Sequence, residues 1–221
     1  MPTDARLNEP RAEGRRRDSR LEKLLFRLEA QRICLEWAFR EIAGRPGIVF
    51  EMGLGHGRTY DHLRIHLPDR EIYVLDRETD CFADCTPPQN HLLLGDIEET
   101  LAAAATRFGG QVILAHADMG SYVEANNIVT SAKLSRCLPA VLSPHAIVLS
   151  DLPLELAGTS SLPHPPGAPK DTYFLYVNGP PCSADVPLRE NVDCTGRNDD
   201  ESQERNRAFG HHQHFRPSCK R

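Results

Sequence analysis

Three alternate glycines follow an acidic residue in the segment VFEMGLGHGRTY, residues 49–60. Glu51 stands two positions before Gly53, and Gly55 and Gly57 complete the pattern. Glycine allows positive φ and close approach of the backbone, so a ligand can lie over such a turn at the start of a helix. The dinucleotide fingerprint G-x-G-x-x-G would need glycine at position 58, where the chain carries arginine. The segment therefore predicts a ligand site, and its spacing argues against an NAD-dependent oxidoreductase.

Polar residues stand at the ends of three later apolar runs. Asp76 ends the second run, at the position where a carboxylate binds ribose hydroxyls in α/β nucleoside sites. An aspartate at this position can also stabilise a turn or cap a helix. His116 and Asp118 follow the fourth run, and Asp151 follows the fifth. Because ligands of open α/β sheets bind at the carboxyl ends of the strands, we expect these side chains to border one site.

The apolar runs and the segments between them predict the fold. The runs lie at 48–52, 71–76, 91–94, 112–115, 146–149 and 172–177. Apolar residues at helical spacing predict helices at about 18–42, 58–67, 97–108 and 122–142. Continuously apolar strands that alternate with helices are typical of a parallel sheet covered on both faces. The chain is therefore predicted to be a doubly wound α/β protein, with a mostly parallel Rossmann-like sheet and an N-terminal helix.

The composition of the two ends differs from that of the middle. Residues 1–18 and 179–221 are poor in apolar side chains, so we expect a disordered arm and a disordered or loosely attached tail around a domain at 19–178. The cysteines and histidines of the tail lack the spacing of a zinc finger, and no metal site is predicted. The proline-rich segment 152–171 is predicted to be a long loop.

Charge and hydropathy argue against several classes of partner. Residues 21–177 hold thirteen basic and twenty acidic side chains, so the middle of the chain offers no basic surface for phosphates and we expect no nucleic-acid partner. The sequence has neither a membrane-spanning apolar run nor an apolar segment near its N-terminus, so we expect no membrane association and no secretion. Seven scattered cysteines fit reduced thiols in a cytoplasmic protein.

The glycine-rich turn is followed by LLLGDI at 92–97 and AHAD at 115–118. Together with the alternation of strands and helices, these segments resemble the class I S-adenosylmethionine-dependent methyltransferases. More narrowly, the pattern E-x-G-L-G-x-G-R-T-Y-D-H-L is similar to a small bacterial family of uncharacterised S-adenosylmethionine methyltransferases. The resemblance covers about residues 25–177 and implies methyl transfer from that cofactor.

The resemblance also implies roles for the residues around the turn. Glu51 would supply negative charge near the ammonium and sulfonium groups of the cofactor, through water or through the amides of the turn, and Thr59 would face its carboxylate. Asp96 and Ile97 stand where such enzymes bind the adenine, although Asp96 would equally cap the helix at 97–108. Arg77 either lies along the adenine or reaches solvent.

The sequence indicates less about the residues that would bind the methyl acceptor. His116 and Asp118 are the candidate general bases if the acceptor must lose a proton. The chain departs from the metal-dependent catechol-type O-methyltransferases, because histidine stands at 116 and methionine at 119 where those enzymes have aspartate and lysine. The expected acceptor is a small molecule. A non-catalytic S-adenosylmethionine-binding protein is the alternative, and the sequence does not indicate an oligomeric state.

Overall fold

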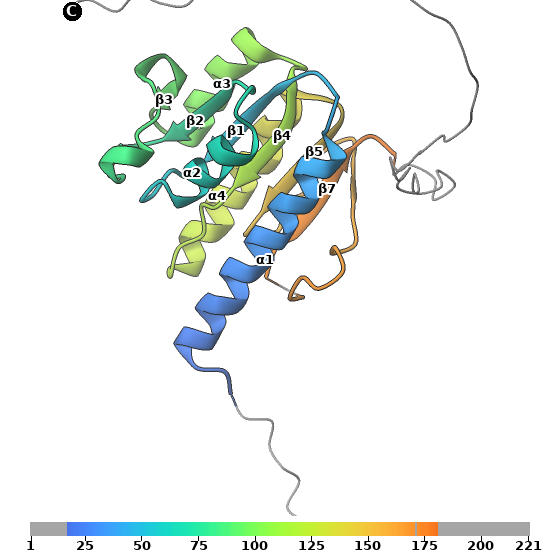
Figure 1. The fold of residues 1–221 in the computed structure, drawn as a ribbon. Coiled ribbons are helices and arrows are strands. Elements are labelled where there is room, and N and C mark those ends of the chain that lie inside the picture. The colour runs from blue at the N-terminus through green and yellow to red at the C-terminus, as the bar shows by residue number, and fades with distance from the viewer. Residues whose placement is uncertain (1–16, 171, 181–221) are drawn as a thin grey trace, which may run out of the picture. The chain divides into compact units, whose positions relative to one another are not determined.

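A seven-stranded sheet forms the centre of the molecule, with the strand order β3-β2-β1-β4-β5-β7-β6 (Figure 1). The computed structural model describes residues 17–170 and 172–180, so most of the predicted arm 1–18 and tail 179–221 lies outside the described residues. The strands are β1 (Ile48–Met52), β2 (Ile72–Asp76), β3 (Leu92–Leu94), β4 (Val112–Ala117), β5 (Leu142–Ser150), β6 (Thr159–Ser161) and β7 (Phe174–Asn178).

The sheet is mostly parallel, as the sequence predicts. Neighbouring strands from β3 to β5 pair in parallel, whereas β7 pairs antiparallel with both β5 and β6. The chain moves outward from β1 to β2 and β3, then returns to the other side of β1 to form β4. The strand order therefore reverses between β1 and β4, and a crevice opens there at the carboxyl ends of the strands.

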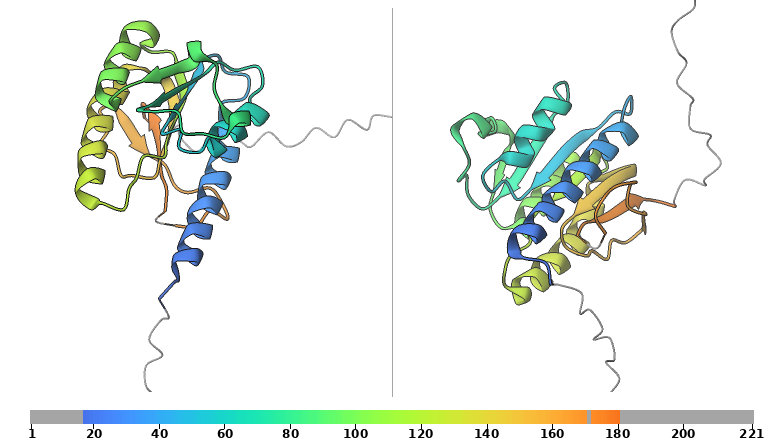
Figure 2. Two further views of the ribbon diagram at one scale, coloured as in Figure 1. Left: turned by 90° about the vertical axis from the view of Figure 1, so that its left-hand side faces the viewer. Right: turned by 60° about the horizontal axis from the view of Figure 1, so that its bottom comes forward.

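Helices cover both faces of the sheet, and Figure 2 shows the resulting three layers. The helices are α1 (Arg20–Glu41), α2 (Arg58–His66), α3 (Ile97–Phe108) and α4 (Glu124–Cys137), with single 3₁₀ turns at Ala83–Cys85, Gln89–His91 and Leu138–Ala140. One buried cluster joins α1 and α2 to the sheet, and a second joins α3 and α4 to its opposite face. No helix within the described ranges is long and apolar enough to cross a membrane.

Local signals explain where the first and third helices begin. A reciprocal pair starts α1: the hydroxyl of Ser19 accepts from the amide of Glu22 at 3.1 Å, and the carboxylate of Glu22 accepts from the amide of Ser19 at 2.6 Å. Asp96 caps α3 by accepting from the amide of Glu98 at 3.0 Å. Such caps satisfy amides that have no partner within the helix.

The structure corrects several predicted bounds. Strand β4 extends to Ala117, beyond the predicted 112–115, and β5 begins at Leu142, four residues before the predicted start at 146. The helix predicted at 122–142 is α4 followed by a 3₁₀ turn. The apolar pattern of β4 stops at His116, but the strand continues because a neighbouring strand satisfies the imidazole, as described below.

The proline-rich segment 152–171 is not only a loop, because it contains β6. Leu154 and Leu156 are buried in the core beneath α3 and α4, and Leu162 packs against the opposite core. The side chains of Ser131 and Ser135 on α4 bond the backbone of Pro153 and Glu155. The segment therefore covers part of the sheet.

Candidate active site

A cleft of about 660 Å³ lies at the carboxyl ends of β1, β2 and β4. Five residues of the predicted cofactor site line it: Gly53, Gly55, Asp76, Arg77 and Ile97. The other predicted cofactor positions lie close by but do not line the cleft: Glu51, Gly57, Thr59 and Asp96. The main chain after β4, from Asp118 to Ser121, forms the opposite wall.

The three glycines of the turn meet different surroundings. All have positive φ, between 47° and 91°. A side chain at Gly53 would clash with the carbonyl oxygen of Asp118, and one at Gly57 would clash with Cys85. Nothing lies within 4 Å of the position that a Cβ of Gly55 would take. Gly53 and Gly57 therefore let chain segments pack closely, whereas Gly55 leaves open space at the cleft.

Asp76 holds the glycine turn in place. Its Oδ2 accepts from the amides of Leu54 at 2.6 Å and Gly55 at 3.3 Å, and its Oδ1 accepts from the amide of Arg77 at 2.6 Å. The end of β2 is thereby tied to the turn after β1. The side chain of Arg77 is exposed at the mouth of the cleft.

Asp96 is held by two partners. Besides capping α3, it receives Lys133 from α4, whose Nζ lies 2.8 and 2.9 Å from the two carboxylate oxygens. The hydrogen bonds from Lys133 and from the amide of Glu98 lower the pKa of Asp96. The helix-cap role that the sequence allowed is therefore present, and Ile97 beside it lines the cleft.

A buried polar pair lies under the cleft. Glu51 on β1 is opposite His116 on β4, and both side chains point to the sheet face that α1 covers. The Oε2 atom of Glu51 lies 2.6 Å from Nδ1 of His116, and neither side chain has any exposed surface. Burial raises the pKa of Glu51. Burial lowers the pKa of His116, but the adjacent carboxylate outweighs it and the net shift is upward.

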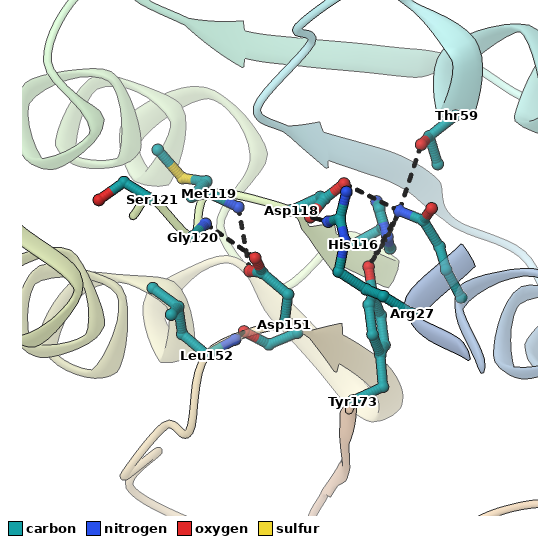
Figure 3. A network of polar contacts seen from close by, with 12 residues as sticks. Arg27, Thr59, His116, Asp118, Met119, Gly120, Ser121, Asp151, Leu152 and Tyr173 are labelled. Atoms are coloured by element: carbon teal, nitrogen blue, oxygen red, sulfur yellow. Dashed lines mark hydrogen bonds and ion pairs between the residues drawn. The ribbon is translucent and has the colours of Figure 1, made fainter. Parts of the chain in front are cut away.

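Two residues that the sequence analysis did not select extend this pair, and Figure 3 shows one of them, Tyr173, beside His116. The hydroxyl of Tyr173 lies 2.5 Å from Nε2 of His116. Gln31 on α1 donates to that hydroxyl at 3.2 Å and to Oδ2 of Asp118 at 3.0 Å. A sequence signal for Gln31 exists, because it begins the spacing i, i+3, i+4, i+7 with Cys34, Leu35 and Ala38, which are all buried.

Helix α1 also supplies a cation at the cleft. The guanidinium of Arg27 lies 2.5 Å from Oδ1 of Asp118. Thr59, predicted to face the carboxylate of the cofactor, stands in the first turn of α2 with its hydroxyl 3.4 Å from Nε2 of Gln31. The N-terminal helix thus reaches the site through Arg27 and Gln31.

Asp151 at the end of β5 completes the acidic side of the site. Its carboxylate accepts from the amides of Met119 at 3.0 Å and Gly120 at 2.8 Å. Burial and the neighbouring carboxylate of Asp118 raise the pKa of Asp151 to about 6. A second cavity, of about 830 Å³, lies between α4 and residues 151–155 and has Asp151 in its wall.

The two predicted general bases, His116 and Asp118, have different environments in the structure. His116 was expected to follow the fourth strand, but it lies inside β4 and is fully buried. Only Asp118 lines the cleft. The reason is that His116 finds its partners across the sheet and beneath α1, so its polarity does not require contact with solvent. Any role of His116 must therefore pass through the groups that it touches.

An open, mostly parallel sheet with a glycine-rich first turn and a cleft at its switch point defines a Rossmann-like, cofactor-binding α/β protein. Residues 18–178 match the family described as S-adenosyl-L-methionine methyltransferase, and the chain belongs to this family. It is an S-adenosyl-L-methionine-dependent methyltransferase. The oxidoreductase and non-catalytic alternatives are thereby set aside.

Solved structures include a relative of the chain. The crystal structure of an S-adenosyl-L-methionine methyl transferase from Silicibacter pomeroyi DSS-3 is 41% identical, with a TM-score of 0.71, over 74% of this chain and all of that chain.

Two other solved structures are more distant. A point mutant of the 16S rRNA (adenine(1408)-N(1))-methyltransferase from Catenulisporales acidiphilia, solved with its cosubstrate, is 16% identical with a TM-score of 0.42, over 67% and 92% of the two chains. The antibiotic-resistance methyltransferase Kmr is 10% identical with a TM-score of 0.43, over 66% and 92%. No curated protein matches the chain.

Proposed function

We propose that the cleft binds S-adenosyl-L-methionine and that the methyl group passes to a small molecule held beside Asp118 and Asp151. When bound, the cofactor supplies an electrophilic methyl group on a sulfonium centre. Asp76 and Arg77 at the end of β2 would hold the ribose and border the adenine, and Ile97 would pack against the adenine ring. Gly53 and Gly55 would lie against the methionine part.

The residues present fit such a cofactor. Oε1 of Glu51 is buried, and no group of the described ranges forms a hydrogen bond with it. A buried carboxylate oxygen without a partner carries a desolvation cost, which a donor on a ligand would offset. The ammonium group of the methionine moiety is such a donor, directly or through a water molecule, so we assign Glu51 to it. The open space at Gly55 is the second feature that fits a ligand over the turn.

The observation that carries the acceptor assignment is the pair formed by Asp118 and Asp151. The pair stands between the cofactor cleft and the second cavity. Because the pKa of Asp151 is about 6, its carboxylate is mostly ionised at neutral pH and remains basic enough to take a proton from an acceptor. Asp118, fixed by Arg27 and Gln31, is the second candidate base.

Two properties favour a small acceptor over a nucleic acid. The second cavity of about 830 Å³ is within the usual size of small-molecule sites, about 300–1,000 Å³. Residues 21–177 carry an excess of acidic side chains, which repels a phosphate backbone.

A turnover assay tests the proposal. The protein is incubated with S-adenosyl-L-methionine and a panel of small amines, phenols and carboxylates, with ribosomal RNA in a parallel reaction, and S-adenosylhomocysteine is measured. We expect turnover with a small molecule, and we expect Asp151→Asn to lower its rate by about 100-fold or more. Asp69→Asn, a change at an exposed residue distant from both aspartates in the sequence, is the control. Turnover with RNA and with none of the small molecules would contradict the acceptor assignment.

A further inference from the structure

We infer that Tyr173 and Gln31 are positioning residues of the cofactor site: they hold His116 in the tautomer that donates to Glu51, so that the second oxygen of Glu51 remains an acceptor for the ammonium group of the cofactor. The inference rests on the proposed place of Glu51 in the site. It concerns two residues that the sequence analysis did not select.

The first step is the amide of Gln31. Its Nε2 carries two hydrogens but has four polar atoms within 3.4 Å. The two nearest are Oδ2 of Asp118 at 3.0 Å and the hydroxyl oxygen of Tyr173 at 3.2 Å. The hydrogens therefore go to these two atoms, and the amide of Gln31 joins Asp118 to Tyr173.

The second step is the hydroxyl of Tyr173, which has one hydrogen to give. Its oxygen accepts from Gln31, so the hydrogen is directed to Nε2 of His116 at 2.5 Å. Burial raises the pKa of Tyr173 well above its usual value, so the hydroxyl keeps this hydrogen. Nε2 must then be unprotonated, and the imidazole carries its hydrogen on Nδ1, facing Oε2 of Glu51 at 2.6 Å.

The doubly protonated imidazole fits the contacts less well. Glu51 favours it by charge, but a hydrogen on Nε2 would point at the oxygen of Tyr173 and leave the tyrosine hydrogen without an acceptor among the contacts of the described chain. Such a buried, unsatisfied hydroxyl carries a desolvation cost. The neighbouring carboxylates raise the pKa of His116 and so oppose this assignment, but the hydrogen-bond geometry favours the neutral imidazole.

The third step concerns charge. With a neutral His116, the buried carboxylate of Glu51 has one oxygen bonded and one without a partner in the part of the chain that the structure describes. Burial raises the pKa of Glu51, and a neutral imidazole does not offset this cost of ionising the carboxyl group. An ammonium group placed at Oε1 would supply both the missing hydrogen bond and the opposite charge. If the tautomer inverted, Nδ1 would become an acceptor and Glu51 would need a proton of its own, which would remove the charge that attracts the ammonium group.

A matched pair of variants separates positioning from stability. Tyr173→Phe removes the hydroxyl that faces His116. Tyr176→Phe removes a comparable hydroxyl, which accepts from the amide of Leu154 at 2.8 Å in the core on the opposite face of the sheet. Both tyrosines are buried, so both variants should lose stability, but only Tyr173→Phe should alter the cofactor site.

The experiment has two readouts on the full-length protein. In the first, ¹⁵N NMR of the assigned His116 imidazole at pH 7.5 should show an unprotonated Nε2 and a protonated Nδ1 in the wild type. This readout requires no variant to fold. An Nε2–H tautomer or a doubly protonated ring in the wild type would overturn the inference.

The second readout is the affinity for S-adenosyl-L-methionine by calorimetry. We expect Tyr173→Phe to weaken binding about tenfold and Tyr176→Phe to leave it within about twofold of the wild type. Equal affinities of Tyr173→Phe and wild type would overturn the positioning role and leave the cofactor assignment intact. A wild-type protein that does not bind S-adenosyl-L-methionine would instead contradict the proposed site.

Discussion

Asp118 and Asp151 follow two adjacent parallel strands, β4 and β5, and both belong to the edge where the cofactor cleft lies. They are held differently. Asp118 contacts side chains of α1, namely Arg27 and Gln31, whereas Asp151 accepts from two backbone amides. Burial raises the pKa of Asp151, the nearby carboxylate of Asp118 adds to this shift, and Asp151 has no cation among its described contacts to oppose it.

This difference can be measured by titration. The carboxyl ¹³C signal of Asp151 should titrate with a midpoint near 6, and Asp118→Asn should lower that midpoint because it removes the neighbouring charge. A folded pKa above the unfolded value of about 3.9 means that ionisation of Asp151 opposes folding. The cost is absent below about pH 4, grows between about pH 4 and 6, and is complete above about pH 6. A wild-type midpoint near 4 would contradict this account, and Asp69→Asn should leave the midpoint unchanged.

At the scale of elements, the turn between β1 and α2 is built from two kinds of glycine. Gly57 is needed because the 3₁₀ turn Ala83–Cys85 packs against it, and Gly53 because the chain after β4 does. Gly55 has no such neighbour. Glycine at positions 53 and 57 therefore contributes to stability, whereas glycine at position 55 leaves space for a ligand.

Two alanine substitutions should separate these roles. Gly57→Ala has an unfavourable φ of 83° and a clash with Cys85, so we expect a loss of about 2 kcal/mol or more in the free energy of unfolding. Gly55→Ala has only the strain of φ 47°, about 1 kcal/mol, but its methyl group enters the open space at the cleft and should weaken S-adenosyl-L-methionine binding several-fold. Urea unfolding and calorimetry measure the two effects. A Gly55→Ala protein with unchanged affinity would place the cofactor elsewhere.

At the scale of the whole molecule, the sheet separates two cores, one under each layer of helices. Every residue of both clusters lies between Ala30 and Val177. The site depends on both layers, because α1 reaches it from one face and Lys133 of α4 from the other. Figures 1 and 2 show α1 beside the sheet with its N-terminal half extending past the strands.

The location of the two cores predicts that residues 17–180 are sufficient for folding and cofactor binding. A protein limited to this range should unfold within a few degrees of the full chain and should bind S-adenosyl-L-methionine with similar affinity, because no apolar residue of either core is removed. Thermal unfolding and calorimetry on the two proteins provide the comparison. A large drop in unfolding temperature would show that residues 1–16 or 181–221 stabilise the domain.

The sequence by itself determined the succession of the four helices and of all strands except β6, the mostly parallel sheet and the glycine-rich turn with Asp76. These features depend on periodic burial and on local turn chemistry, which are present in short stretches of the chain. It also placed Asp118 and Asp151 at one sheet edge, because parallel strands bring their carboxyl ends together.

Only the tertiary structure decided which polar residues reach solvent and which lie beneath the site. His116 is buried because the β1–β4 register places it opposite Glu51, and a register is set by contacts between distant segments. Gln31 and Tyr173 meet across 142 positions of sequence, through the packing of α1 against the sheet. Residues so far apart are joined by long-range packing alone, so neither motif nor spacing could reveal that they complete one hydrogen-bond network.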